Sequence, residues 1–240
     1  PLLFKKSARP LRNNYKIALS RFLSLERRFK RQPELKPHYV AAIHTYFDRG
    51  DAEPVPQREI NAVTCFYLPH SIVAKPDRES TRYRVVFDAS CTNQDGLSLN
   101  SQIAQTPVQA PAISGILLRF RRHRIALTSD VSKMFLQYTL REDDKKYHRF
   151  LWRDHEKGEI GHFQLTKMTF GVADSPYKAM EVTRLHVSKF SSERPLAVKE
   201  LSTNLYVDDL LSGADSVEQC RTLFDDCCFI MDGAGLSPTS

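Results

Sequence analysis

Two adjacent acidic residues interrupt an otherwise apolar run, "TNLYVDDLLSG", and they limit the folds that this chain can adopt. The run is typical of a strand, and carboxylates are rarely buried unless a cation or a partner pairs with them. Because side chains alternate across a strand, Leu205 and Val207 are expected on one face and Tyr206 and Asp208 on the other. We therefore expect Asp208 and Asp209 where a hairpin turns, exposed above a sheet.

Helical and strand patterns succeed one another along the 240 residues, and no internal repeat is visible. Apolar residues at helical spacing predict helices at 14–31, 33–49, 112–124, 175–190 and 217–231. Runs of β-branched and aromatic residues predict strands within 65–76, 82–90, 125–130, 148–165 and 203–213, with a tight turn and a helix after residue 130. This order predicts an α+β fold in which helices pack on a sheet.

The chain carries 35 Lys and Arg against 28 Asp and Glu, a net charge of +7. The excess is uneven, because residues 1–31 hold ten basic side chains and the single acid Glu26. A basic surface of this kind favours polyanions, with nucleic acid first among them. The alternative interpretation is a basic face that is only solvated.

Five Cys residues, an odd number with no Cys-x-x-Cys pair, argue against a disulfide framework and against a zinc knuckle. An intracellular, reducing setting is expected. The apolar runs are far shorter than the ~20 residues of a membrane span, and no signal peptide opens the chain. Because the chain opens on Pro1 and stops at "LSPTS", we expect a piece of a longer polyprotein.

The neighbouring carboxylates of Asp208 and Asp209 repel each other, and a divalent cation offsets that repulsion. Mg²⁺ prefers oxygen ligands, usually one or two carboxylates together with substrate phosphates. A third acid, Asp130, ends another apolar strand in "IALTSDVSKMF". Two cations held by such acids suit nucleotidyl transfer to a primer 3′-hydroxyl. An Asp-Asp pair alone is more often an ordinary turn.

Four motifs follow in one order, namely "RYRVVFDAS", "LTSDVSKMFLQ", "KMTFGVADSP" and "YVDD", and together they resemble the fingers and palm of retroelement reverse transcriptases. From about residue 11 to the end, segments such as "YLPHSIVAKPD", "RFLWRD" and "YVDDLLSGA" are most similar to the Bel/Pao group of LTR retrotransposons. The resemblance implies an α+β polymerase right hand whose palm is an antiparallel sheet backed by helices, a ferredoxin-like core. It implies a basic helical lead-in at residues 1–64, fingers and palm at 65–240, and no thumb.

The resemblance also implies the activity and its residues. The chain would be an RNA-directed DNA polymerase whose catalytic and metal-binding residues, holding two Mg²⁺ or Mn²⁺ ions, are Asp130, Asp208 and Asp209. The nucleotide-binding residues would be Lys75, Arg84, Val131, Phe135, Phe170 and Gly171. The primer and template residues would be Tyr206, Ser175 and Pro176. Its partners would be a primed RNA or DNA template, deoxynucleoside triphosphates, and the protease, ribonuclease H and integrase of the polyprotein, in a cytoplasmic particle without a membrane.

Physical chemistry agrees with several of these roles. Arg84 offers a bidentate fork for phosphate, and Lys75 supplies a mobile point charge. Phe135 lies five residues beyond Asp130, where the family places the aromatic ring that blocks a ribose 2′-hydroxyl. Each residue also has a structural alternative, which is surface solvation for the basic residues, core packing for Phe135, and helix capping for the Ser-Pro pair at 175–176.

This sequence departs from the retroviral pattern at two points. Phe170 stands where retroviral enzymes carry Gln before the Gly that matches Gly171, so only a packing contact with the nucleotide is expected there. The chain also ends before the Lys that the family supplies as a proton donor to pyrophosphate. Two other functions therefore stay open: an inert or domesticated fragment that binds nucleic acid, and an RNA-synthesising palm polymerase, which Phe135 and Tyr206 disfavour.

Overall fold

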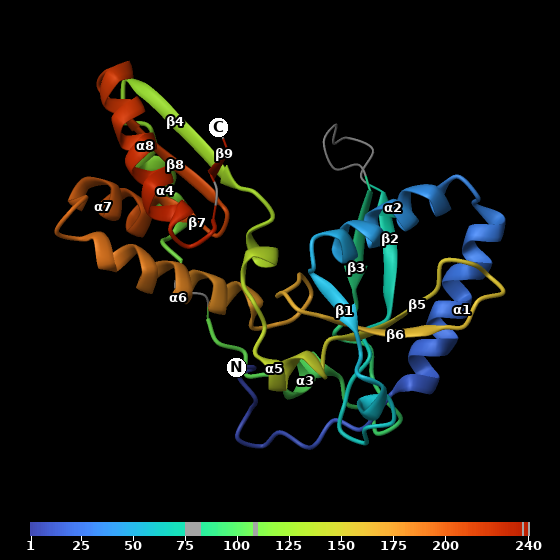
Figure 1. Cartoon of the computed structure of the whole chain (residues 1–240). Coiled ribbons are helices and arrows are strands. Elements are labelled where there is room, and N and C mark those ends of the chain that lie inside the picture. The colour runs from blue at the N-terminus through green and yellow to red at the C-terminus, as the bar shows by residue number, and fades with distance from the viewer. Residues whose placement is uncertain (75–82, 108–109, 237, 240) are drawn as a thin grey trace. The chain divides into compact units, whose positions relative to one another are not determined.

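The computed structural model describes residues 1–74, 83–107, 110–236 and 238–239 (Figure 1). The chain divides into two compact units. The first unit comprises Pro1–Gln105 and Thr139–Ser175, and the second comprises Thr106–Tyr138 and Pro176–Ser240. These units reflect packing, so the expected functional segments 1–64 and 65–240 stay a prediction.

The described residues form eight α-helices: α1 Tyr15–Arg31, α2 Leu35–Asp48, α3 Leu99–Gln102, α4 Ile113–Phe120, α5 Glu142–Lys145, α6 Ser175–Val187, α7 Pro195–Asn204 and α8 Val217–Asp232. Their strands are β1 Ala52–Pro54, β2 His70–Ala74, β3 Tyr83–Phe87, β4 Ile125–Val131, β5 Arg149–Trp152, β6 Gly161–Leu165, β7 Leu205–Tyr206, β8 Asp209–Ala214 and β9 Pro238–Thr239. Short 3₁₀-helices occupy Gln57–Glu59, Met134–Gln137 and Ser188–Phe190.

The five helices expected from periodicity are present as α1, α2, α4, α6 and α8. The expected helix after β4 is a single 3₁₀ turn, Met134–Gln137. Helix α7 was not expected, although Pro195 stands at its first turn, where proline is favoured. Helices α3 and α5 span four residues each, which is too short for a periodic pattern to identify them.

Helix α1 shows how sequence spacing sets packing in the first unit. Its buried residues are Ala18, Phe22, Leu25 and Phe29, which share one face at intervals of four, three and four. That face packs on β5 and β2. Glu26, the only acid of the helix, receives two hydrogen bonds from Arg153, at 2.8 Å and 2.6 Å. The solvent face of α1 is therefore left with its basic residues.

The first unit also contains two antiparallel sheets, one in the order β1-β6-β5 and the other the hairpin β2-β3. His70 lies buried at the start of β2. Its Nε2 donates to the carbonyl of Leu151 at 2.8 Å, and its Nδ1 bonds the hydroxyl of Tyr39. Burial lowers the pKa of His70 to about 4, because the charged ring would lose its hydration.

The second unit is built on an antiparallel sheet in the order β7-β8-β4-β9. After α4, its elements run β4, α6 with α7, β7, β8, α8 and β9, which is the βαββαβ order of ferredoxin-like folds. Helices α4, α7 and α8 contact this sheet. Residues 139–175, between β4 and β7, belong to the first unit. The expected antiparallel sheet with helices on it is thus present.

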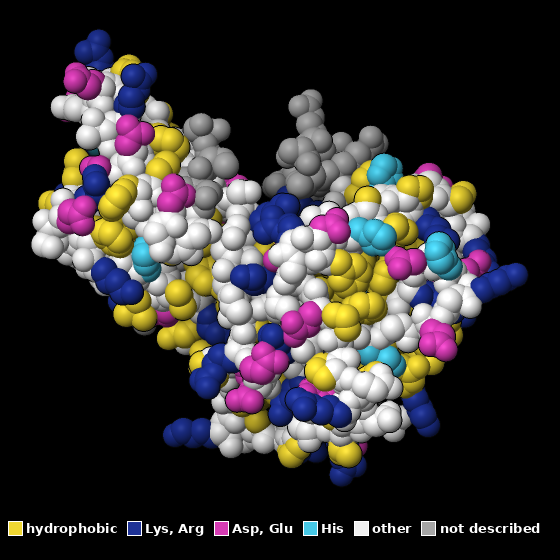
Figure 2. All heavy atoms as spheres, in the orientation of Figure 1, with side chains coloured by type: hydrophobic (Ala, Val, Ile, Leu, Met, Phe, Trp, Pro, Cys, Tyr) yellow, Lys and Arg dark blue, Asp and Glu magenta, His cyan; other side chains and the backbone are white. Residues whose placement is uncertain are grey.

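Acidic and basic side chains are interspersed on the face of the molecule drawn in Figure 2. The excess of positive charge therefore does not form one uniform patch on that face. Among the residues that the structure describes, no helix is long and apolar enough to cross a membrane. All five Cys side chains are free thiols.

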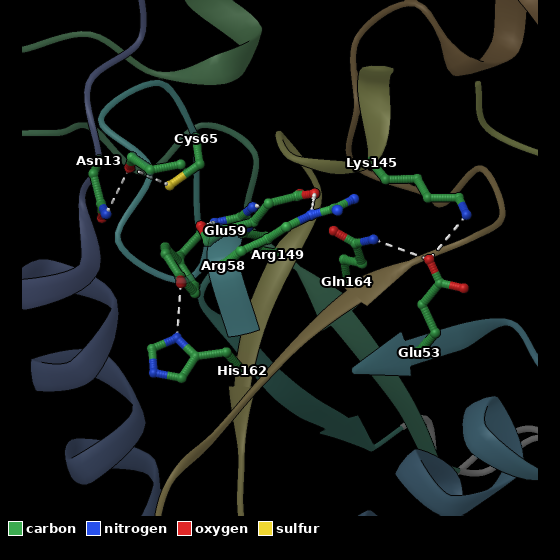
Figure 3. Close-up of polar contacts among 11 residues, drawn as sticks. Asn13, Glu53, Arg58, Glu59, Cys65, Lys145, Arg149, His162 and Gln164 are labelled. Atoms are coloured by element: carbon green, nitrogen blue, oxygen red, sulfur yellow. Dashed lines mark hydrogen bonds and ion pairs between the residues drawn. The ribbon is translucent and has the colours of Figure 1, made fainter. Parts of the chain in front are cut away.

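A buried arginine joins the segments of the first unit (Figure 3). Arg149 of β5 is fully buried, and one terminal nitrogen donates to the carbonyl of Glu59 at 2.8 Å. Nearby, Lys145 and the amide of Gln164 both donate to the carboxylate of Glu53, each at 2.9 Å. Partial burial acts to raise the pKa of Glu53. The two hydrogen bonds and the positive charge of Lys145 outweigh burial, so this pKa lies below its ordinary value. Most of the polar groups drawn there bond one another, whereas the buried Nε of Arg149 has no hydrogen-bond partner among the described residues.

Candidate active site

The two strands that carry the predicted catalytic acids pair directly. In the antiparallel register of β4 and β8, Asp130 lies opposite Asp209. Side chains directly opposite in such a ladder share one face, with Cβ atoms about 5 Å apart. Both residues are exposed, as are Ala126 and Thr128, which precede Asp130 on the same face of β4. The fold therefore places two of the three predicted acids side by side at one end of an exposed sheet face.

The third acid lies in the turn between β7 and β8. Tyr206 pairs with Asp209, so Val207 and Asp208 form a two-residue hairpin turn. The carbonyl of Asp208 accepts the N–H of Val131 at 2.8 Å, which fastens the turn to the end of β4. The expectation that the acids lie at a hairpin turn is confirmed, but the expected strand alternation stops at Tyr206, and Asp208 in the turn is half-buried. Their surroundings are the end of a sheet and not the centre of a buried strand.

Val207 has an unusual backbone conformation, with φ of 58°. A positive φ is common for Gly in two-residue hairpins, but it is a genuine outlier for a β-branched residue. Such a conformation costs on the order of 1–3 kcal/mol and persists only where the surroundings impose it. Here the pairing of β7 with β8 and the bond between Val131 and Asp208 impose it. The strain therefore lies directly beside the candidate catalytic acids.

The donor set suits a hard cation, because three carboxylates provide only oxygen ligands. Among the residues that the structure describes, however, no group of three His, Cys, Asp or Glu side chains is arranged to hold a metal ion. The acids are thus paired by strand register, but their side chains do not converge as a ready-made three-ligand site. Metal binding at Asp130, Asp208 and Asp209 stays a prediction.

The opposite face of the same strand pair is covered. Ser212 of β8 is fully buried and donates to the carboxylate of Glu200 on α7 at 2.8 Å. The amide of Asn204 also donates to Glu200 and accepts from Nε of Arg119 at 2.7 Å. This network holds α4 and α7 against the sheet and makes Arg119 a structural residue, whereas Arg121, Arg122 and Arg124 after α4 are exposed.

Two predicted nucleotide-binding residues follow Asp130 in the second unit. Val131 is buried, and its backbone is engaged with the hairpin turn. Phe135 is 3% exposed within the 3₁₀ segment after β4, which fits the packing alternative, and its contact with a sugar stays a prediction. Tyr138 ends this segment and bonds the hydroxyl of Thr183 on α6. Burial raises the pKa of Tyr138 to about 12, so this anchor stays neutral.

The other predicted nucleotide-binding residues belong to the first unit. Arg84 lies half-buried on β3, opposite Val73 of β2, and Lys75 lies outside the described residues. Phe170 is 57% exposed. Gly171 has φ of 96°, and a Cβ at this position would lie 2.6 Å from the carbonyl oxygen of Phe87. Only glycine fits at this position, because any other residue would be strained by the positive φ and would collide with Phe87.

The predicted primer and template residues are placed as follows. Tyr206 is 37% exposed on β7, opposite Asp209. Ser175 is buried, and its hydroxyl donates to the carbonyl of Thr169 at 3.0 Å. Pro176 occupies the next position in the first turn of α6. Ser175 therefore ties the start of α6 to the chain that precedes it, whereas its contact with a template stays a prediction.

One residue of this region was missed by sequence reasoning. Asn100 of α3 bonds the backbone of the segment that follows Phe170. Its position in "SLNSQ" gives no sign of this contact, because the partner segment lies about 70 residues away. Only the pairing of distant segments identifies it.

Solved structures with a similar fold include protease-reverse transcriptases of foamy virus. The native protease-reverse transcriptase of prototype foamy virus matches with a TM-score of 0.57 and 20% identity, over 82% of this chain and 22% of that chain. The foamy viral protease-reverse transcriptase in complex with an RNA/DNA hybrid matches at 0.62 and 18%, over 96% and 25%. The selenomethionine-labelled CSH mutant of the prototype foamy virus protein matches at 0.61 and 19%, over 100% and 26%.

The chain spans about a quarter of the length of these proteins. No family model matches the chain, and no curated protein matches it. At 18–20% identity, the similarity shows a reverse-transcriptase-like fold.

Proposed function

We propose that this chain is the fingers and palm of a reverse transcriptase, an RNA-directed DNA polymerase from the polyprotein of a Bel/Pao-like LTR retrotransposon. The observation that carries the proposal is the register that sets Asp130 opposite Asp209, with Asp208 in the adjoining turn. The fold similarity supports a polymerase, and the four ordered motifs support the Bel/Pao assignment. The free thiols agree with a cytoplasmic particle.

The proposed reaction joins a primer 3′-hydroxyl to the α-phosphorus of a deoxynucleoside triphosphate and releases pyrophosphate. Two Mg²⁺ or Mn²⁺ ions held by Asp130, Asp208 and Asp209 would supply activation of the hydroxyl and charge neutralisation of the leaving group. The rigid pairing of β4 with β8 fixes two of these carboxylates on one face. Arg84 and Lys75 are proposed to neutralise the triphosphate through charge-assisted hydrogen bonds.

The decisive test is primer extension on a homopolymer RNA template, with Mg²⁺ and with EDTA in its place. We expect extension by the intact chain only when the metal is present, and deoxynucleotides should be used in preference to ribonucleotides. Preferred ribonucleotide use would favour an RNA-synthesising polymerase. Absence of extension under all conditions would overturn the assignment of an active polymerase to these 240 residues.

A second candidate is a nucleic-acid-binding module without catalysis. The basic solvent face of α1 favours it, because Lys16, Arg27 and Arg31 are exposed on that helix. A primed template would then bind with steep salt dependence, and metal or nucleotide would change nothing. A filter-binding assay beside the extension assay separates the two functions.

A further inference from the structure

Asn100 joins two motifs that lie far apart in the sequence. Its amide oxygen accepts the backbone N–H of Ala173 at 2.8 Å, and its amide nitrogen donates to the carbonyl of Gly171 at 2.7 Å. The same nitrogen donates to Ser90 Oγ at 2.9 Å, and its own backbone N–H bonds the carbonyl of Ala89 at 3.0 Å. One side chain thus ties the segment "FGVA" to the segment "FDAS".

The helix that carries Asn100 is itself held firmly. Ser98 caps α3 by accepting the N–H of Ser101, and the hydroxyl of Ser101 accepts the N–H of Ser98 in return. Leu99, beside Asn100, is fully buried. The four-residue helix therefore presents the amide from a fixed position.

The segment that Asn100 binds has little freedom on its other side. The backbone of Gly171 passes so close to Phe87 that no side chain fits, and Val172 is buried at 3% exposure. Phe170, directly before, is 57% exposed. The bonds from Asn100 thus set the backbone at the point where the chain turns from a buried segment to an exposed aromatic side chain.

We propose that Asn100 is a positioning residue for nucleotide binding, acting by holding the backbone of Phe170 and Gly171. The inference rests on the proposed function, in which this pair contacts the incoming nucleotide. Phe170 has no side-chain amide with which to bond a nucleotide. Any contribution of this segment to nucleotide binding must therefore come from its backbone and from the position of the Phe170 ring. Asn100 meets the need for a donor and an acceptor on one short side chain, which neither Asp nor Leu provides.

The first test uses hydrogen exchange, which does not depend on catalysis. Asn100→Ala removes the acceptor of the Ala173 N–H, so exchange of that amide should accelerate by about tenfold or more while distant amides are unchanged. Ser90→Ala is the matched control, because it removes only the third bond and leaves both backbone bonds intact. Unchanged exchange at Ala173 in folded Asn100→Ala overturns the positioning role.

The second test measures nucleotide use. Asn100→Asp keeps the acceptor but sets a carboxylate against the carbonyl of Gly171. We expect KM for the deoxynucleotide to rise about tenfold with kcat within about threefold, because small misplacements of a binding segment weaken binding strongly. Ser90→Ala should stay within about twofold of the parent in both constants.

A third variant separates positioning from general loosening. Asn93 accepts two backbone N–H bonds, from Asp95 and Leu97, within its own loop. If Asn93→Asp raises KM as much as Asn100→Asp does, the effect is general and the proposal fails. If exchange at Ala173 responds as expected but the parent protein binds no nucleotide, the proposed function fails. The role of Asn100 in holding the backbone of Gly171 and Ala173 would still be supported.

Discussion

A buried polar cluster in the first unit contrasts with the exposed acids of the second unit. In the first unit, His70 and Asn14 are buried, and their polar atoms bond backbone groups and Tyr39. In the second unit, Asp130 and Asp209 are exposed at the end of a strand pair whose other face buries Ser212. The first arrangement stabilises the fold, whereas the second leaves charge accessible to solutes.

This contrast indicates which substitutions should report on folding and which on function. A buried bonded group is costly to alter, because its partners lose hydrogen bonds inside the protein. An exposed carboxylate contributes little to stability, and most surface changes alter it by less than about 0.5 kcal/mol. Five predictions test this division, beginning with the one for which we expect the greatest change.

The strongest contrast concerns the exposed acids. Asp130→Asn should reduce primer extension by about 10³-fold, since charge at a preorganised site is removed. The free energy of unfolding should change by less than about 0.5 kcal/mol. Extension rates and denaturant titrations on the same preparations measure both quantities. Asp215→Asn, an exposed acid of the second unit outside the motifs, should leave extension unchanged. Activity of Asp130→Asn within a few fold of the parent would falsify the catalytic assignment.

Nucleic-acid binding should show which unit supplies the basic residues that bind phosphates. If about six phosphates are bound, affinity falls by about 10³-fold between about 50 and about 200 mM salt. Two triple variants to Gln compare the units: Lys16, Arg27 and Arg31 on α1, and Arg121, Arg122 and Arg124 after α4. The slope of log affinity against log salt concentration measures how many phosphates are bound. For each phosphate-binding side chain that a variant removes, the magnitude of this slope should fall by about 0.9. A slope unchanged in both variants shows that these basic faces are only solvated.

Acid should destabilise the first unit through His70. Burial lowers its pKa to about 4, so the unfolded chain binds more protons than the folded chain between about pH 6.5 and 4. The contribution of neutral His70 to the free energy of unfolding is therefore complete above this window. It is lost as pH decreases through the window, by about 3 kcal/mol in all. Burial lowers the pKa of His162 as well, which acts in the same direction.

The single Trp of the chain, Trp152, lies in β5 beside Tyr39, so its fluorescence reports on the first unit. Denaturant titrations followed by this fluorescence should show the acid loss. His70→Gln should flatten the pH dependence, and exposed His155→Gln should retain it. Equal pH dependence in His70→Gln and the parent would contradict this attribution.

Phe135 lies between the two classes, because it is buried and yet close in sequence to Asp130. If its ring blocks a 2′-hydroxyl, Phe135→Val should raise ribonucleotide use relative to deoxynucleotide use by about tenfold, equal to the removal of about 1–3 kcal/mol of overpacking. Single-nucleotide insertion kinetics measure this ratio, with Leu136→Val as control. Unchanged selectivity together with a lower melting temperature identifies Phe135 as a core residue.

The smallest effect is expected at the strained turn. Val207→Gly should stabilise the second unit by about 1 kcal/mol, because relief of strain exceeds the added freedom of the unfolded glycine. Val63→Gly, at an exposed position without a positive φ, should be neutral or destabilising. Thermal unfolding compares the two variants. Destabilisation by Val207→Gly would show that the turn is not strained.

The sequence predicted much of this fold because the signals are local. The spacing of Ala18, Phe22, Leu25 and Phe29 identifies the buried face of α1, and the acids within "YVDD" identify a hairpin turn. Helix α7 escaped prediction because its buried residues include Glu200 and Asn204, which an apolar pattern does not count. Their burial depends on Ser212 and Arg119, residues that belong to other elements.

The sequence alone predicted five of the eight described helices, the hairpin and the identity of the candidate acids, because periodicity and turn chemistry act over a few residues. Tertiary structure alone decided that Asp130 lies opposite Asp209, since strand register joins positions 79 residues apart (209 − 130). It alone decided that Asn100 holds Gly171 and Ala173, and that Phe135 is buried. These contacts depend on how distant segments pack, and no pattern of neighbouring residues encodes that packing.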